Sequence, residues 1–331
     1  MTSSTSKPAP TVDQGDSRLK HFPVSWFSTV MGMTGLSIAW NRAEYFFDSG
    51  VCQSSGLLTL TILWMLALTL VYALKIIKYP ADVIAEVTHP VKQAFVPTFS
   101  ISLLLLSVAY LESARDFSFW LWSIGATLHL GLTFYILSSW LQLNKYEIAH
   151  LNPAWFIPVV GNIFVPIAGM AHAGPEISWF FFSLGIFFWP VLTAIIFYRL
   201  IFHTALPDRL QPTLFIFIAP PAVGFISWLK LSGSVGAFGQ ILYSVALIFT
   251  LLLLTQINHF RKIPFYLSWW AYSFPLAAIT IASFLMAQTE GQRIYLWIGE
   301  ALLVLLSALI AMLIWRTAKA VMRREICVPG H

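Results

Sequence analysis

The stretch LNPAWFIPVVGNIFVPIAG at residues 151–169 places three prolines inside an apolar run. From Pro153 to Ala171 the chain has no Asp, Glu, Lys, Arg or His. A run of about twenty such residues is long enough to cross a bilayer as a helix. Each proline leaves a backbone carbonyl without its usual partner, and lipid offers no replacement. The stretch therefore predicts an inner helix of a polytopic membrane protein.

The composition of the whole chain supports this class. Of the 331 residues, 58% are hydrophobic and only 10% are charged, whereas soluble domains carry about 25% charged residues. The mean hydropathy is +0.76. So few charges cannot cover a water-soluble surface, and the net charge of +5 gives no nucleic-acid signal. We therefore expect an all-α integral membrane protein.

Apolar runs bounded by charged or turn-forming residues divide the chain. Ten of them lie at 22–41, 54–77, 93–111, 117–142, 153–172, 177–202, 212–230, 236–258, 264–288 and 293–315. They predict a transmembrane domain of ten helices over 21–318. Residues 1–20 are polar and are predicted to be a disordered cytoplasmic tail, and residues 319–331 a cytoplasmic C-terminal tail.

The basic residues predict the orientation. With both termini on one side, that side holds 15 of the 19 Lys and Arg residues, and the other holds Arg42, Arg115, Lys230 and Arg293. The positive-inside rule then places both termini in the cytoplasm. Cys52 and Cys327 fall on opposite sides on this topology, so they cannot form a disulfide with each other.

The prolines favour alternate helices. Ten lie on the odd-numbered helices, and the even-numbered ones have only Pro190. Because a kinked helix needs neighbours for its freed carbonyls, we expect five helix pairs with the odd members inside and the even members facing lipid. General tolerance of proline in transmembrane helices is the alternative.

The odd helices contain no ionisable residue at depth. Proton-coupled transporters usually need Asp, Glu or His there, and cation pores often use acidic rings. A neutral lining of this kind could let weakly bound anions pass. His129 and Glu300 lie at depth on even helices, either as proton sites or as partners of neighbouring helices. We find no catalytic or metal-binding set and expect neither an enzyme nor a cofactor.

Four stretches together resemble the slow anion channel / TehA family, which includes plant guard-cell anion channels and bacterial tellurite-resistance proteins. They are FPVSWFSTVMGMTGLSIAW at 22–40, YPADVIAEVTHPVKQAFVPTFSISLLLLS at 79–107, LNPAWFIPVVGNIFVPIAG at 151–169 and SWWAYSFPLAA at 268–278. The resemblance implies five helical hairpins with quasi-fivefold symmetry. The odd helices would line a central pore in each subunit of a homotrimer.

The resemblance also implies a gate. The helix 9 motif puts Phe274 at the position of the phenylalanine that closes the pore in this family, directly before Pro275. Relatives often carry glycine where this chain has Ser28, which puts the tightness of the closed gate in doubt. Gly32 and Ala278 are predicted beside the pore or the gate. Asn162 either binds an anion or repairs a carbonyl freed by Pro166.

The sequence thus predicts passive, gated transport of small monovalent anions such as chloride or nitrate across the bacterial inner membrane. Its expected partners are small inorganic anions and membrane lipid. The alternative is a secondary transporter that exports sulfite, malate or another C4-dicarboxylate. A divalent substrate would favour an Arg or Lys in its site, and the odd helices have none at depth.

Overall fold

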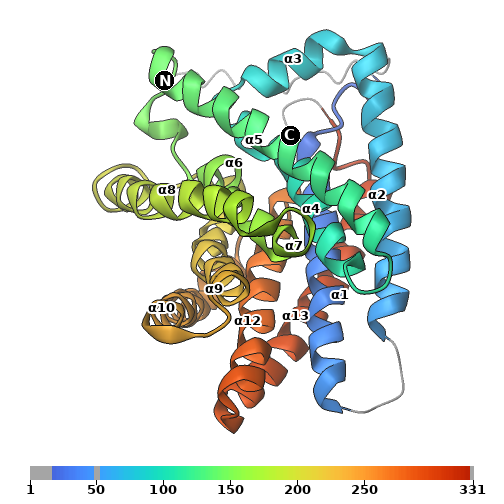
Figure 1. Ribbon diagram of the computed structural model, residues 1–331. Coiled ribbons are helices and arrows are strands. Elements are labelled where there is room, and N and C mark those ends of the chain that lie inside the picture. Colours follow the sequence, from blue (N-terminus) through green and yellow to red (C-terminus); the bar gives the residue numbers. More distant parts are fainter. Residues whose placement is uncertain (1–16, 48–52, 329–331) are drawn as a thin grey trace, which may run out of the picture.

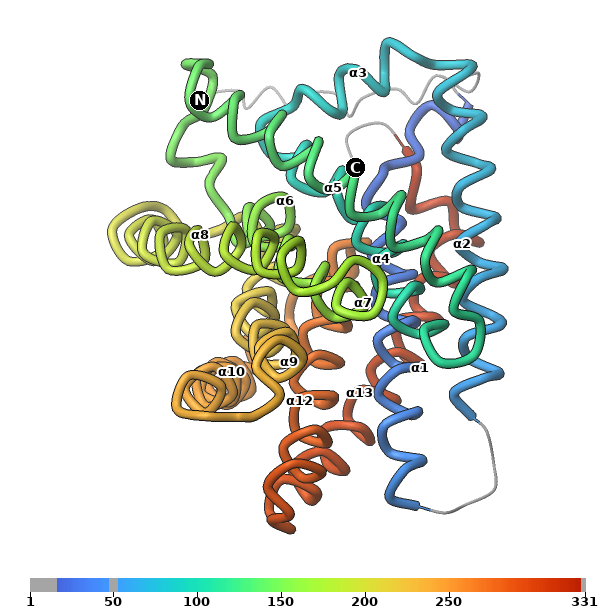
Figure 2. The backbone as a smooth tube through the Cα atoms, in the orientation of Figure 1, coloured from blue at the N-terminus to red at the C-terminus, as the bar shows by residue number. Residues whose placement is uncertain are grey.

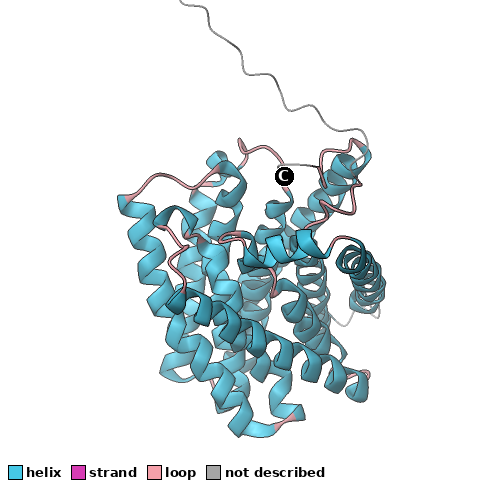
Figure 3. Cartoon of the chain, turned by 90° about the horizontal axis from the view of Figure 1, so that it is seen from above, coloured by secondary structure: helices cyan, strands magenta, loops and turns pink. Residues whose placement is uncertain are grey.

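The computed structural model describes residues 17–47 and 53–328, and every regular element in these ranges is a helix (Figure 1). Figure 3 shows the same all-helical bundle from above. Residues 1–16 of the predicted N-terminal tail and Cys52 lie outside the described residues. The prediction of an all-α membrane protein is confirmed.

Ten long helical segments make up the bundle in the described part of the chain. Nine of them are long and apolar enough to cross a membrane, and α1 lies beside them as a further long helix. The α-helices of these segments are α1 (Phe27–Phe47), α2 (Gln53–Lys78), α4 (Thr98–Tyr110), α5 (Arg115–Gln142), α6 (Phe156–Val160), α7 (Val165–His172), α8 (Gly174–Phe202), α9 (Ala219–Ser232), α10 (Gly236–Thr255), α12 (Ser273–Glu290) and α13 (Arg293–Met322).

Consecutive helices pack as antiparallel pairs, namely α1 with α2, α4 with α5, α7 with α8, α9 with α10, and α12 with α13. The first members of the pairs also contact one another. Helix α1 packs against α4, α4 against α7, α7 against α9, α9 against α12, and α12 returns to α1 (Figure 2). These five helices therefore form a closed inner ring. Exact fivefold symmetry stays a prediction.

Burial separates the two members of each pair. Between 67% and 94% of the apolar window is buried in the segments Lys92–Tyr110, Pro153–His172, Asp208–Ser232 and Leu267–Glu290. In the five outer helices the share is only 17% to 33%. The prediction that the proline-rich helices lie inside is confirmed, because lipid-facing helices cannot bury most of their residues.

Each inner segment changes helix type partway along its length. In each case a 3-10 helix comes first and an α-helix follows it. The successive elements are η1 (Val24–Trp26) before α1, η2 (Lys92–Phe95) before α4, η5 (Gly161–Phe164) before α7, η6 (Asp208–Ile218) before α9, and η7 (Leu267–Tyr272) before α12. At four of these junctions a proline lies within three residues of the first α-helical residue: Pro97, Pro166, Pro220 and Pro275.

Hydrogen bonding explains the tighter turns. Val165 and Ala219 each donate their backbone N–H to the carbonyl three residues earlier. A 3-10 bond of this kind satisfies a carbonyl that a nearby proline cannot reach, because proline has no N–H. The prolines thus shape the inner helices without leaving these carbonyls bare.

The apolar-run analysis missed α3 (Pro80–Thr88), a short helix that crosses the top of the bundle in Figure 1. It lies on the face where the described chain begins and ends, which we name the terminal face. On this face Arg18 donates to the carbonyls of Val321 and Ile326 at 3.4 and 3.3 Å, respectively. The short elements η3 (Ile148–His150), η4 (Pro153–Trp155) and α11 (Ile257–Phe260) complete the described fold.

Candidate functional site

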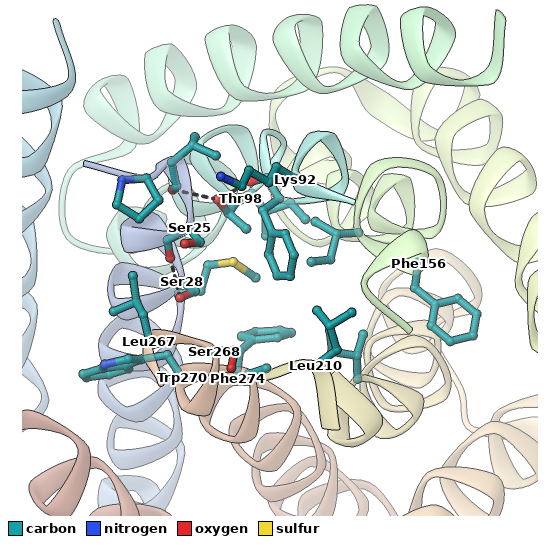
Figure 4. Close-up of a pocket in the computed structure, with 18 of the residues that line it drawn as sticks. Ser25, Ser28, Lys92, Thr98, Phe156, Leu210, Leu267, Ser268, Trp270 and Phe274 are labelled. Carbon is teal, nitrogen blue, oxygen red and sulfur yellow. Dashed lines mark hydrogen bonds between the residues drawn. The ribbon is translucent and has the colours of Figure 1, made fainter. Parts of the chain in front are cut away.

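A cavity of about 480 Å³ lies inside the inner ring. All five junctions contribute residues to its wall, among them Ser28, Thr98, Phe164, Ala219 and Phe274. Figure 4 shows Ser28, Thr98 and Phe274 around one open space, while the ring of Phe156 points away from it. The change of helix type therefore places one short segment from every inner helix around a common space.

Two aromatic rings meet in the wall of this cavity. Phe274 is 6% exposed and lies in the first turn of α12. Its ring centroid is 5.1 Å from that of Phe164, and the ring planes are inclined by 49°. Since both rings border the same cavity, together they narrow it more than either ring would alone.

The predicted neighbours of Phe274 divide into two groups. Ser28 and Pro275 line the cavity. The Ser28 hydroxyl donates to the carbonyl of Ser25 at 2.6 Å, so its proton is already used. Ala278 is buried one turn beyond Phe274 and does not belong to the cavity wall.

Gly32 lies between two inner helices. A methyl group built on it would lie 2.2 Å from the Ser273 hydroxyl oxygen. The next glycine on the same face, Gly35, would place a methyl group 2.7 Å from Ala277 and 3.5 Å from the Phe274 ring. Close approach of α1 and α12 is thus the structural use of both glycines, and Gly35 is the nearer one to the Phe274 ring.

Asn162 turns away from the cavity. It is fully buried, and its amide group donates to the Thr133 hydroxyl at 2.9 Å and to the Val159 carbonyl at 2.8 Å. The carbonyl that Pro166 leaves free is that of Asn162 itself, and it accepts the N–H of Val165. The amide thus ties α5 to the inner segment.

The two deep ionisable residues also lie away from the cavity. His129 is fully buried, and its Nδ1 is 2.9 Å from the Ser100 hydroxyl on α4, so it bonds a neighbouring helix. Its Nε2 has no hydrogen-bond partner among the described residues and lies beside Gly161. Glu300 is half-buried on the outer helix α13 and forms no ion pair with another described residue.

Basic side chains surround the cavity on the terminal face. Lys92 and Arg209, which we name the cationic mouth, line it together with His89. Neither Lys92 nor Arg209 has an acidic partner among the described residues. Partial burial, then the charges of Lys92, His150, Arg209 and Lys145, hold the pKa of His89 below its ordinary value.

Deeper in the cavity the wall is neutral. The Thr98 hydroxyl donates to the Phe95 carbonyl at 2.6 Å. Most of the remaining wall is aliphatic or aromatic. Within the described ranges, no group of three or more His, Cys, Asp or Glu side chains is placed to hold a metal ion.

Sequence reasoning missed Phe164 and the cationic mouth. Phe164 lies two residues before Pro166, much as Phe274 lies one before Pro275. A search for aromatic residues just before inner-helix prolines would have found it. Lys92 and Arg209 were counted only for topology, because loop residues distant in sequence carry no signal that they meet around one cavity.

Comparison with known proteins gives a consistent result. The family described as voltage-dependent anion channel matches residues 21–318. An uncharacterized transporter of Methanocaldococcus jannaschii is 29% identical over 318 residues, which cover 88% of this chain and 92% of that protein. The S-type anion channel SLAH3 of Arabidopsis thaliana is 29% identical over 272 residues, 80% of this chain and 43% of the plant protein.

A third relative carries the other name attached to this group. The tellurite resistance protein TehA homolog of Haemophilus influenzae is 25% identical over 263 residues, which cover 78% of this chain and 79% of that protein. The matches to channels and transporters support anion transport as the general activity of a multi-pass membrane protein.

Proposed function

Because the chain belongs to the voltage-dependent anion channel family, we propose that it is a gated pore for small monovalent anions such as chloride or nitrate. The anions move passively through the inner ring of each subunit. Phe274, together with Phe164, occludes the path in the closed state. The wall composition carries this proposal, since a cationic mouth leads into a cavity whose deeper wall offers no charge.

The two parts of the wall act on an anion in sequence. Lys92 and Arg209 raise the local concentration of anions at the mouth, because like charges around a low-dielectric cleft focus the field. Deeper down, an anion meets side chains whose hydroxyl protons are already donated to carbonyls. Weak binding favours conduction, because an ion that binds tightly leaves slowly.

The inner segments add a weak positive field at the mouth. Four of them begin with helical turns that line the cavity, namely η1, η2, η6 and η7, and the amino end of a helix carries a partial positive charge. Several such ends around one mouth favour an anion over a cation without a fixed charge further along the path. This supports anion selectivity in a pore with neutral inner helices.

The two phenylalanine rings provide the barrier. A constriction lined by apolar rings excludes water and raises the free energy of a hydrated ion. Phe274 and Phe164 are in contact, so a narrow apolar point forms between α12 and η5. Displacement of either ring opens the path.

The test is chloride flux from proteoliposomes that contain the purified full chain. Phe274→Ala is expected to raise the flux strongly over that of the parent. Phe187→Ala is the matched control, because Phe187 is 65% exposed on the outer helix α8. Equal flux for Phe274→Ala and the control would refute the gate.

The same vesicles separate a channel from a coupled transporter of sulfite, malate or another C4-dicarboxylate. A channel carries anions down their gradient whether or not a proton gradient is present. Uptake that needs a proton gradient, and that Glu300→Gln abolishes, would favour the transporter.

Orientation and assembly belong to the same proposal. The basic bias of the terminal face supports a cytoplasmic location for it in a bacterial inner membrane, and family resemblance favours a homotrimer. Labelling of a cysteine at Lys20 in inverted vesicles but not in intact cells tests the orientation. The mass of the detergent-solubilised protein tests the trimer.

A further inference from the structure

A buried ion pair lies beneath α3 at the edge of the cavity. The Lys75 ammonium at the end of α2 is 2.7 Å from the Glu86 carboxylate on α3, and the two side chains are only 4% and 7% exposed. Burial of two charges is costly unless each is paired and further hydrogen-bonded. The pair is therefore held in place by more than mutual attraction.

Two further bonds of the pair go to the start of the first inner segment, and a third comes from α2. The Val24 backbone N–H donates to one oxygen of Glu86 at 2.7 Å, and Lys75 donates to the Phe22 carbonyl at 2.8 Å. The Tyr72 hydroxyl donates to the other oxygen of Glu86 at 3.2 Å. The two charged groups thus bind the backbone of the residues before and after Pro23. Ser25 and Ser28, which line the cavity, follow directly in the sequence.

The two partners lie differently with respect to the cavity. Glu86 belongs to the cavity wall, and Lys75 does not. Glu86 is also the only acidic residue in that wall among the described residues. A carboxylate at this point would repel an anion arriving from the cationic mouth, unless a cation directly behind it cancels its charge.

We propose that Lys75 and Glu86 form a positioning pair for anion passage. Glu86 fixes the first inner segment by accepting the Val24 N–H, and Lys75 compensates the carboxylate so that it does not repel anions. The fixed segment keeps Ser25 and Ser28 at the wall. This inference rests on the proposed anion flux, so its test includes a measurement that does not depend on flux.

The first measurement is chloride flux in the Phe274→Ala background at low ionic strength. Lys75→Met leaves the Glu86 carboxylate uncompensated and lowers the flux by about threefold to tenfold. Glu86→Gln leaves the ammonium uncompensated and increases the flux at low chloride. The double variant Lys75→Met/Glu86→Gln has no charge at this site and returns the flux close to that of the background.

Two neighbouring residues provide matched controls. Lys78→Met removes an exposed cation one turn further along α2, and Asp82→Asn removes a carboxylate from the other end of α3. Neither lines the cavity, so both are expected to leave the flux unchanged. A Lys75→Met defect that the double variant does not relieve overturns charge compensation, as does a flux that neither single variant changes.

The second measurement is amide hydrogen exchange of the full chain in lipid nanodiscs. Glu86→Ala removes the acceptor of the Val24 N–H and is expected to speed exchange over residues 24–28, whereas Asp82→Ala does not. Unchanged exchange in Glu86→Ala overturns the positioning role. If Phe274→Ala carries no chloride, that result counts against the proposed function, and the exchange result still decides whether the pair holds this segment.

Discussion

The rings of Phe164 and Phe274 lie with their centroids 5.1 Å apart in the wall of the same cavity. They come from segments more than one hundred residues apart in sequence, yet each ring is within two residues of a proline where a 3-10 helix gives way to an α-helix. The contact therefore joins two junctions of the inner ring, and the two rings should act as one barrier.

Phe164→Ala should also raise chloride flux, because it removes one of the two rings that form the barrier. The fold-increase in chloride flux of the double variant should be smaller than the product of the fold-increases of the two single variants. Contacting aromatic rings typically couple by about 0.5–1.5 kcal/mol. A double-mutant cycle on flux rates measures this coupling, and independent multiplication of the two effects would contradict it.

Gly32→Ala should destabilise the protein by roughly 1–3 kcal/mol, since the new methyl group overlaps Ser273 and forces α1 and α12 apart. Gly32→Ala/Ser273→Gly should recover most of the loss. Gly131→Ala is the control, because its methyl group would meet no atom within 4 Å. Thermal unfolding in detergent measures the effect, and equal stability of both single variants would show that the contact is not tight.

Lys92→Gln and Arg209→Gln should each lower chloride flux at low ionic strength, because they remove charge from the cationic mouth. The loss should shrink as salt increases, since the Debye length falls to about 10 Å at 0.1 M. Lys262→Gln removes an exposed cation outside the cavity wall and should have little effect. A loss that does not change with salt would point to a structural defect instead.

Acidification on the side of the terminal face should increase chloride flux, because it protonates His89. Its pKa lies below the ordinary value, so the imidazole is neutral at pH 7 and gains its charge only as the pH falls below the usual histidine range of about 6.5. The neutral ring accepts the N–H groups of Val91 and Lys92 at Nδ1, and protonation there both adds charge and loosens the turn.

The measurement for His89 is flux between about pH 7.5 and about pH 5. His89→Gln should flatten the increase, whereas His203→Gln, which lies outside the cavity wall, should keep it. His150, Lys92, Arg209 and Lys145 face His89, so His150→Gln is measured as well. An acid response that survives in both His89→Gln and His150→Gln would assign it to another group.

The inner and outer helices could be predicted because a proline in a helix leaves a carbonyl without a donor, and lipid cannot supply one. A proline such as Pro97 or Pro166 leaves a carbonyl unpaired, and only a protein neighbour or a tighter turn can satisfy it. This cost acts within a few residues, so it is visible in a single sequence. The family resemblance then directed attention to Phe274. This residue lines the cavity, and its role as the gate stays a prediction.

The remaining features depend on contacts between distant segments. Asn162 sits in an inner helix like a pore residue, but its amide bonds Thr133 on an outer helix, and no local pattern encodes that partner. Phe164 acquires its place only when η5 meets α12. Helix α3 escaped notice because nine residues are too few to span a bilayer and a search for long apolar runs passes over them.

The turn after α13 has a practical consequence for anyone who engineers this chain. Arg324 adopts a left-handed conformation, and the chain then reverses so that Ile326 and Cys327 line the cavity. A fluorescent protein or affinity handle attached directly after Cys327 is thus tethered beside the path that anions would take. Reporter fusions for this protein are better inserted in the connection between α12 and α13, at the opposite face.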